Sequence, residues 1–149
     1  MSNSICSANA PKPMGMYPHA RRVGNLLFLS GIGPRDAASN AIIGDVHDVD
    51  GYLISYDIEA QCRAVFANVR TVLKASGAHW EDLVDVTVYL TNMAHDFKVY
   101  NAVWAEYFPD IDHAPCRTTV GITALPTPIA IELKCIAALQ DTPMENRSS

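Results

Sequence analysis

The sequence has no concentration of basic side chains. Its formal net charge is -5, and its 11 Lys and Arg residues are spread over 149 positions without forming a cluster. Proteins that bind nucleic acid or anionic membrane surfaces usually present such clusters. We therefore expect no nucleic-acid and no membrane partner, and favour a small molecule or further copies of the same chain.

Long apolar runs and paired cysteines are absent as well. No segment approaches the ~20 consecutive apolar residues that cross a bilayer, and residues 1–13 lack the basic start and apolar stretch of an export signal. In a chain without such a signal, scattered cysteines are typically reduced thiols rather than a disulfide framework. The four cysteines are Cys6, Cys62, Cys116 and Cys135. These absences predict a soluble, cytoplasmic protein.

The signatures of two cofactor-dependent sites are incomplete. A zinc deaminase needs Pro-Cys-x-x-Cys among its metal ligands, but the stretch "PCRTT" ends in Thr119 where the second cysteine would stand. The stretch "SGIGPRD" contains Gly31 and Gly33, but Asp36 occupies the place of the third glycine of a dinucleotide fingerprint. We therefore expect a site that uses no metal and no cofactor.

The chain does have the composition and length of one globular domain. Nearly half of its residues are hydrophobic, which is enough for a single core. Both ends are rich in Ser, Asn and Pro, and this predicts flexible tails at residues 1–13 and 140–149. The domain itself is expected at residues 14–139.

Hydrophobic periodicity within the domain predicts the order β-β-α-β-α-β-β. Gly24 and Asn25 mark a two-residue hairpin turn, Asp57 caps a helix that stops at Gly77, and Pro109 ends a second helix. The predicted elements are a strand that ends before Gly24, a strand at 26–30, a long loop with room for a short hairpin at 35–56, helices at 57–76 and 96–108, and strands at 83–90, 117–123 and 129–138, the last two joined by "ALPTP".

Two helices can cover only one face of such a sheet. Because side chains alternate between the faces of a strand, strand parity predicts which residues the helices leave uncovered. The predicted open face carries Asp85, Thr87, Tyr89, Thr119, Gly121, Thr123, Glu132 and Lys134. This mixture is too polar for a core and too rich in small residues and β-formers for a purely solvated surface. It predicts contact with other subunits in a closed homo-oligomer.

Two charged residues in the last predicted strands are candidates for chemistry. Arg117 offers a planar guanidinium matched to a carboxylate, although a surface arginine at a strand edge would have the same sequence signature. Glu132 lies in an apolar run and needs a partner, which could be a ligand or its neighbour Lys134. If "ALPTP" forms a simple hairpin, Arg117 and Glu132 lie on the order of 10 Å apart, a separation that suits a small elongated acid.

These residues in this order resemble the Rid (YjgF-type) family, many of whose members hydrolyse reactive enamines and imines to ketones and ammonia without a cofactor. The likeness runs from about Met14 to Ala138 and includes "GMYPHARRVGNLLFLSG", "LVDVTVYLTNM", "YNAVWAEYF", "APCRTTVGITALP" and "IAIELKCIA". It implies an α+β, chorismate-mutase-like single domain, with a mixed β-sheet and two helices on one face. It also implies a homotrimer with clefts between subunits; whether two trimers pair is left open by the sequence.

The resemblance also implies roles for individual residues. Arg117 matches the arginine that binds the substrate carboxylate, and Glu132 matches the glutamate that positions the attacking water. The other implied substrate-binding residues are Tyr17, Ser30, Gly31, Asn101 and Thr119, the last standing where many members carry a cysteine. Lys134 replaces a second glutamate of many members, so the pocket is expected to differ from that of the generic imine deaminase.

Within the family, "KPMGMYPHARRVGNLLFLSG" and "LPTPIAIELKCIA" are most similar to members that act on 2-aminomuconate, a six-carbon dicarboxylic enamine. This likeness predicts hydrolysis of 2-aminomuconate to 4-oxalocrotonate and ammonia in aromatic-compound catabolism. A second clamp for the distal carboxylate could come from Arg35, Arg22, His19 or Lys134. The alternatives are a generic 2-iminobutanoate/2-iminopropanoate deaminase, or a non-catalytic small-acid-binding regulator or chaperone.

Overall fold

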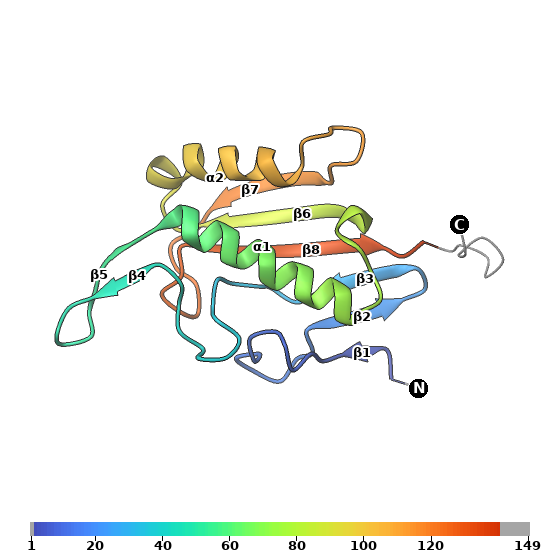
Figure 1. The fold of residues 1–149 in the computed structure, drawn as a ribbon, viewed down its shortest axis with the longest axis horizontal. Helices are drawn as coiled ribbons and strands as arrows, with labels where there is room; N and C mark the ends of the chain where they lie inside the picture. Colours follow the sequence, from blue (N-terminus) through green and yellow to red (C-terminus); the bar gives the residue numbers. More distant parts are fainter. Residues whose placement is uncertain (1, 141–149) are drawn as a thin grey trace.

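The computed structural model describes residues 2–140, in which a mixed six-stranded sheet carries two helices on one face (Figure 1). The strand order is β1-β2-β3-β8-β6-β7, and β4 and β5 form a separate hairpin. The strands are β1 (Ser4–Ile5), β2 (Ala20–Val23), β3 (Leu26–Leu29), β4 (Asp45–His47), β5 (Leu53–Tyr56), β6 (Leu83–Leu90), β7 (Cys116–Gly121) and β8 (Ile131–Ala138). The helices are α1 (Ile58–Ala75), the 3₁₀ turn η1 (Trp80–Asp82) and α2 (Met93–Tyr107). The expected α+β fold is confirmed.

The sheet is antiparallel except at one edge. Strand β6 is antiparallel to β8 on one side and parallel to β7 on the other. A parallel pair needs a crossover connection, and α2 supplies it between β6 and β7. The expected hairpin between the last two strands is therefore wrong, because β6 lies between β7 and β8 and residues 122–130 must span it.

The centre of the core lies between α1 and the two middle strands. Val86, Val88 and Leu90 of β6 are buried beside Leu133 and Cys135 of β8. Both strands alternate buried and half-buried positions over this stretch, as a strand with one covered face should. The helices thus cover one face of β6 and β8, and the opposite face stays open.

Strand β6 is irregular at its start. Its register with β8 shifts between Leu83 and Asp85, so Leu83 is buried and Val84 is 42% exposed. The predicted strict alternation had placed Val84 on the buried face, and this is wrong because the bulge turns the first residues of the strand.

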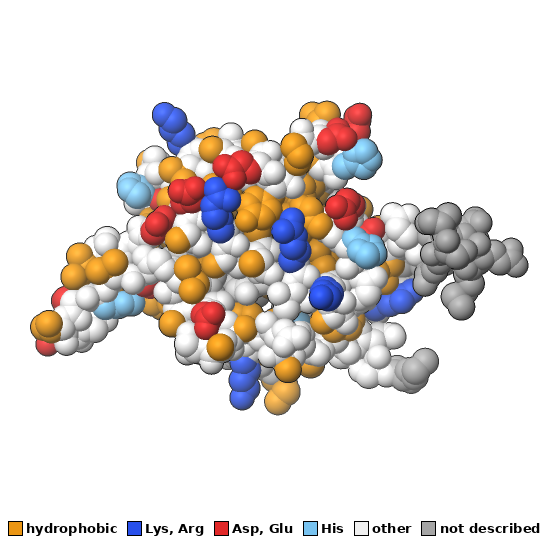
Figure 2. Space-filling view, viewed as in Figure 1, with side chains coloured by type: hydrophobic (Ala, Val, Ile, Leu, Met, Phe, Trp, Pro, Cys, Tyr) orange, Lys and Arg blue, Asp and Glu red, His pale blue; other side chains and the backbone are white. Residues whose placement is uncertain are grey.

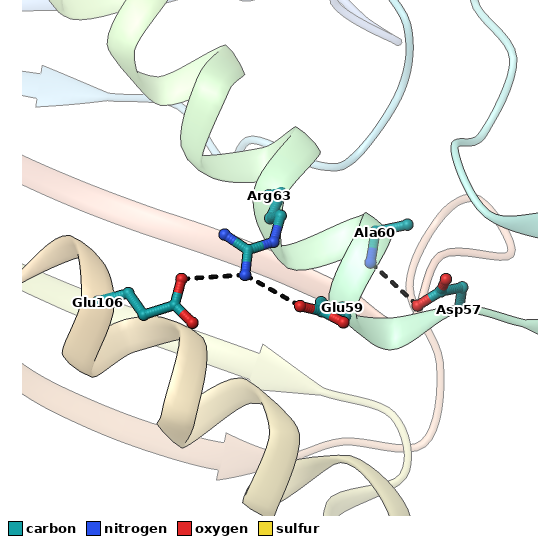
Figure 3. Close-up of polar contacts among 5 residues, drawn as sticks. All are labelled: Asp57, Glu59, Ala60, Arg63 and Glu106. Carbon is teal, nitrogen blue, oxygen red and sulfur yellow. Dashed lines mark hydrogen bonds and ion pairs between the residues drawn. The ribbon is translucent and has the colours of Figure 1, made fainter.

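Helix α1 begins and ends where the sequence predicts. The side chain of Asp57 accepts a hydrogen bond from the Ala60 N–H at 3.1 Å (Figure 3), and Gly77 follows the helix with a φ of 76°. Its buried positions are Ile58, Gln61, Cys62, Val65, Phe66, Val69, Val72 and Leu73. The apolar stripe of α1 packs on β8, on the face that carries the buried Leu133 and Cys135.

Helix α2 begins at Met93 rather than at the predicted Asp96. The side chain of Asn92 caps it by accepting a hydrogen bond from the His95 N–H at 3.3 Å. Asp96 is fully buried inside the first turn and accepts a hydrogen bond from the Tyr56 hydroxyl at 2.7 Å. Asp96 therefore does not cap the helix, as the predicted helix start would suggest; its carboxylate anchors the β4–β5 hairpin to α2.

The two helices are held together by aromatic packing and by surface ion pairs. The rings of Phe66 and Tyr107 lie 4.6 Å apart between centroids, in an edge-to-face arrangement. Arg63 bridges the helices, because it lies 2.9 Å from Glu59 and 3.0 Å from Glu106 (Figure 3). All three charged groups are well exposed, so each pair contributes less than about 1 kcal/mol, and the aromatic contacts contribute more.

The β4–β5 hairpin projects from the domain and presents apolar side chains, including Tyr52 and Ile54, at its exposed end (Figures 1 and 2). Its base is fixed by the buried Gln61, whose Nε2 donates to Asp45 Oδ1 at 2.9 Å. Oε1 of Gln61 accepts from the Ala130 N–H, also at 2.9 Å. This bond joins the hairpin to the residues that lead into β8.

The N-terminal segment differs from the predicted tail. Ser4–Ile5 pairs with β2 and Ala10 is buried, so the described part of residues 1–13 is packed on the domain. Of the expected C-terminal tail at 140–149, residues 141–149 lie outside the described residues. Within residues 2–140, no helix is long and apolar enough to cross a membrane.

Candidate functional site

Glu132 lies on the open face of the sheet, opposite Tyr89 of β6. It is half-buried, and burial raises the pKa of its carboxyl group. No hydrogen bond or opposite charge within residues 2–140 offsets this desolvation. The open alternative of an ion pair with Lys134 is not formed there, since Lys134 Nζ donates to the Leu29 carbonyl. Glu132 is therefore a carboxylate with free lone pairs and a strengthened basicity.

Gly31 forms the wall against which the Glu132 carboxyl group lies. A Cβ atom at position 31 would be only 2.9 Å from the carboxyl carbon of Glu132 and 2.9 Å from Oε2. The backbone beyond this glycine returns to β8, because Ile32 and Leu133 exchange hydrogen bonds of 2.9 Å in both directions. The absent side chain at residue 31 thus creates the space that the carboxylate occupies.

Ser30 and Tyr17 lie next to this wall and line one small cavity with Gly31. The Ser30 hydroxyl donates to the Pro18 carbonyl at 2.7 Å, which fixes the chain beside Tyr17. Tyr17 is 44% exposed, and its hydroxyl accepts a hydrogen bond from the Met14 N–H at 3.1 Å. The structure therefore groups Tyr17, Ser30 and Gly31 at one end of β3. Glu132 does not line this cavity, and of the three residues it lies against Gly31.

Arg117 lies beneath α2, on the helix-covered face of β7. Its Nη1 donates to Asn101 Oδ1 at 2.9 Å. Its guanidinium carbon lies 5.2 Å from the ring centroid of Tyr100 and 5.0 Å from that of Trp104, within cation–π range. One amide and two rings hold the guanidinium in one orientation, and its other nitrogens remain available to a ligand carboxylate.

Thr119 belongs to the same cluster as Arg117. Its hydroxyl lies 2.7 Å from the Tyr100 hydroxyl. Burial raises the pKa of Tyr100, while Thr119 and Arg117 act in the opposite direction, so Tyr100 remains a neutral phenol at physiological pH. The structure therefore groups Asn101, Arg117 and Thr119 around α2.

The two groups of predicted site residues lie on opposite faces of the sheet. Arg117 pairs with Val86, a core residue under the helices, whereas Glu132 pairs with Tyr89 on the open face. Paired residues point to the same face, and neighbours along a strand alternate. The expectation that Arg117 and Glu132 of one chain face one ligand across a hairpin is therefore wrong.

The same register corrects the predicted open face. Thr119 and Gly121 pair with Val88 and Leu90, so they lie on the helix side, and Thr123 lies beyond the end of β7. The residues of β7 that share the face of Glu132 are Cys116, Thr118 and Val120. The assignments of Asp85, Thr87, Tyr89, Glu132 and Lys134 to one face are confirmed by their register.

Several polar residues near the site were not recognised in the sequence. Gln61 occupies a position within the apolar stripe of α1, and this polar interruption is the signal that could have identified it. The contact of the Tyr100 and Trp104 rings with Arg117 depends on the parity of β7, which the local sequence does not reveal. Asp45 has a buried Oδ2 without a hydrogen-bond partner in the described residues, and nothing in its local sequence indicates this.

No cluster of three or more metal-ligating side chains occurs within residues 2–140. The His-x-Glu half of a zinc-deaminase signature is present at His79 and Glu81, but these residues belong to the turn around η1. All four cysteines are free, with Cys62 and Cys135 buried. The four cysteines form no disulfide within the described residues.

Comparison with known proteins gives one consistent family. A sequence model described as endoribonuclease L-PSP matches residues 7–139. A RutC family protein of Pyrococcus horikoshii is 37% identical over 92% of this chain and 98% of its own. Reactive Intermediate Deaminase A of Arabidopsis thaliana is 36% identical over 91% of this chain and 65% of its own. A 2-iminobutanoate/2-iminopropanoate deaminase of Dermatophagoides farinae is 34% identical, over 91% and 95%.

Solved structures agree with the sequence comparison. The YjgF gene product of E. coli superposes with a TM-score of 0.77 at 27% identity, over 93% of this chain and all of that one. RidA of a Psychrobacter species superposes with a TM-score of 0.76 at 28% identity, over 91% and 98%. Sequence and fold therefore indicate the same group of proteins.

Proposed function

Because the chain belongs to the endoribonuclease L-PSP family, the Rid or YjgF-type proteins, we propose that it is a hydrolytic deaminase of 2-imino acids that uses no cofactor. The observation that carries this proposal is the environment of Glu132: a half-buried carboxylate with a raised pKa, no partner in the described residues, and a glycine wall at Gly31. A base of this kind can activate a water molecule, because burial moves its pKa toward the operating pH.

The reaction requires few catalytic groups. Glu132 removes a proton from water while the oxygen attacks the imine carbon and the C=N electron pair moves to nitrogen. The nitrogen takes up this proton from Glu132 and gives a neutral carbinolamine. The carbinolamine hydroxyl then transfers its own proton through Glu132 to the nitrogen, so that the C–N bond breaks, ammonia leaves, and the C=O bond forms. Arg117 binds the carboxylate next to the reacting carbon and fixes its distance from the water. An imine carbon is already electrophilic, so these two residues provide the roles that the hydrolysis needs.

We propose that the complete site forms between copies of the chain. Arg117 and Glu132 cannot reach one small ligand within a chain, because a packed sheet separates them. A closed ring of copies would bring the β7 edge of one subunit to the open face of the next, where each interface holds one arginine and one glutamate. The homotrimer implied by the family resemblance is such a ring.

Two substrate classes fit this site. The named relatives include a deaminase of 2-iminobutanoate and 2-iminopropanoate, so these small monocarboxylic imino acids are the first substrates to test. The second candidate is 2-aminomuconate, the substrate of the family members that this sequence most resembles, although none of the relatives named above has it in its name. The half-buried Lys134 on the face of Glu132 favours this second candidate, because a cation there can bind a second carboxylate.

The description of the matching family also contains the word endoribonuclease. RNA is not favoured as a substrate, because the chain carries a net charge of -5 and no cluster of basic residues that would bind RNA.

The test is ammonia release from freshly generated 2-iminobutanoate and 2-aminomuconate, measured by a coupled assay. We expect wild-type protein to deaminate at least one of them, and Arg117→Ala and Glu132→Gln each to lose about 10²–10⁴-fold in kcat/KM. Ligand binding without ammonia release from any enamine or imine would instead indicate a small-acid-binding regulator or chaperone.

Subunit mixing tests the shared site directly. Arg117→Ala and Glu132→Gln proteins are unfolded together in equal amounts and refolded, so that copies assort at random. A site between copies regains both residues in about a quarter of the interfaces, which predicts about a quarter of wild-type activity. Mixing the two proteins without unfolding is the control. Persistent inactivity of refolded mixtures, alongside full recovery of refolded wild type, would place both residues of each site in one chain.

A further inference from the structure

Three of the four candidate cations for a second carboxylate clamp are bonded to backbone groups of the β2–β3 turn and the N-terminal segment, although His19 and Arg35 line the cavity that contains Gly31. Arg22 donates through Nε to the Gly24 carbonyl in the β2–β3 turn at 2.9 Å. Arg35 donates to the Lys12 carbonyl at 2.9 Å, and both ring nitrogens of His19 bond the backbone of residues 7–11. These three side chains hold the hairpin and the N-terminal segment in place.

Lys134 is the remaining candidate, and it lies on the same face as Glu132. The two residues are separated by one position on β8, so their Cα atoms are about 7 Å apart along the strand. Lys134 Nζ donates to the carbonyl of Leu29, two residues before the Gly31 wall. The ammonium and the catalytic carboxylate therefore both lie over the end of β3.

The charge of Lys134 is poorly compensated. The side chain is half-buried, and desolvation lowers its pKa, with only a small opposing effect from Cys135. An ammonium has three donors, and one carbonyl is its only hydrogen-bond acceptor among residues 2–140. No carboxylate of the described residues lies within 4.0 Å of it. A half-buried cation without an anion is costly, and a ligand carboxylate would remove that cost.

We propose that Lys134 binds the distal carboxylate of a dicarboxylic imino acid and makes the site selective for such substrates. This inference rests on the proposed function, because it places the reacting carbon at Glu132. In a six-carbon dicarboxylate the distal carboxyl carbon lies four bonds beyond the imine carbon, about 5 Å when extended. The Cα atoms of Glu132 and Lys134 are about 7 Å apart on one face, so their flexible side chains can reach two ligand atoms about 5 Å apart, while Arg117 of another copy holds the near carboxylate.

The experiment uses two stable acids that differ only in the second carboxylate. Muconate is hexa-2,4-dienedioate, and sorbate is hexa-2,4-dienoate. Their dissociation constants for full-length wild type are measured by titration calorimetry. A charge-assisted hydrogen bond contributes about 1.5–3 kcal/mol, so wild type should bind muconate about 10–100-fold more tightly than sorbate. In Lys134→Met the two affinities should become equal, while Lys134→Arg should retain part of the preference.

Arg22→Met is the matched control, because it removes a cation held away from Glu132, and it should preserve the full preference. Melting curves verify that each variant is folded, and Lys134→Gln replaces Lys134→Met if the latter is unfolded. The proposal is overturned if wild type binds neither acid, binds both equally, or keeps its preference after loss of Lys134. Binding needs no turnover, so a protein that prefers muconate through Lys134 yet releases no ammonia would refute the deaminase function and leave only the dicarboxylate-binding role of Lys134 standing.

Discussion

Replacing Gly31 with alanine should displace the Glu132 carboxylate without unfolding the protein. The new Cβ atom would lie 2.9 Å from the carboxyl carbon of Glu132, whereas non-bonded carbon atoms prefer about 3.5–4.0 Å. The carboxyl group must therefore move by about 0.6–1.1 Å. A displacement of about 1 Å at a reacting group can cost about 10²-fold in rate, or about 2.7 kcal/mol of transition-state stabilisation.

The stability of the Gly31→Ala variant should change little. Gly31 does not adopt a positive φ, and the atoms in the way belong to the end of a side chain that can rotate. Alanine also reduces the entropy of the unfolded chain, which is worth about 0.4–1 kcal/mol. We expect a melting temperature close to that of wild type, together with a kcat that is about 10²-fold lower.

The assay is ammonia release at saturating substrate, with Gly121→Ala as the matched control. A Cβ atom at position 121 would lie 3.7 Å from Met93 Cβ, an ordinary contact, so this variant should keep near-wild-type activity. In a Glu132→Gln background, Gly31→Ala should cause no further loss, because both changes remove the same function. Gly31→Ala activity within about threefold of wild type would refute the argument that Glu132 is positioned by this wall.

Two further predictions concern stability. Burial raises the pKa of Glu132 above its usual 4.5, so its favourable contribution to folding is present below that pH and is lost as the pH rises through the folded-state pKa. Glu132→Gln should therefore melt above wild type at pH 7 and lose this advantage by pH 4; equal melting temperatures at both pH values would contradict the desolvation. Gln61→Leu removes two buried hydrogen bonds, to the Ala130 N–H and to Asp45, and should lower the free energy of unfolding by about 2–4 kcal/mol in urea denaturation. An unchanged midpoint would show that neither bond contributes.

Elements with a strong local signal could be predicted from the sequence. Asp57 and Gly77 delimit α1 by chemistry that lies within a few residues of each, and the structure agrees. The alternation of β6 predicts its two faces wherever the strand is regular. At Val84 the prediction fails, because the bulge depends on how β6 meets β8 rather than on residues 83–90 themselves.

The position of Arg117 could not be predicted in the same way. Each strand has a period of two, but the register between strands is set by tertiary packing, and a shift of one residue reverses the face of every side chain. The assumed β7–β8 hairpin placed Arg117 and Glu132 in one cleft, whereas the parallel pairing of β7 with β6 places them on opposite faces. Their roles were inferred from family resemblance, and their geometry required the structure.

The opposite-face arrangement couples assembly to the strength of the base. In an isolated chain Glu132 and Lys134 are desolvated on the open face, and neither has an opposite charge within reach in the described residues. Docking of another copy would exclude more water and raise the pKa of Glu132 further, but it would also bring an Arg117 guanidinium toward that carboxylate, which lowers the pKa. Substrate carboxylates placed between these groups would then satisfy the two cations, so that Glu132 is the one charged group left to act on water. Arg117 and Lys134 would thus bind the two ends of the substrate, and Glu132 would act as the base, in a site that only the assembled protein completes.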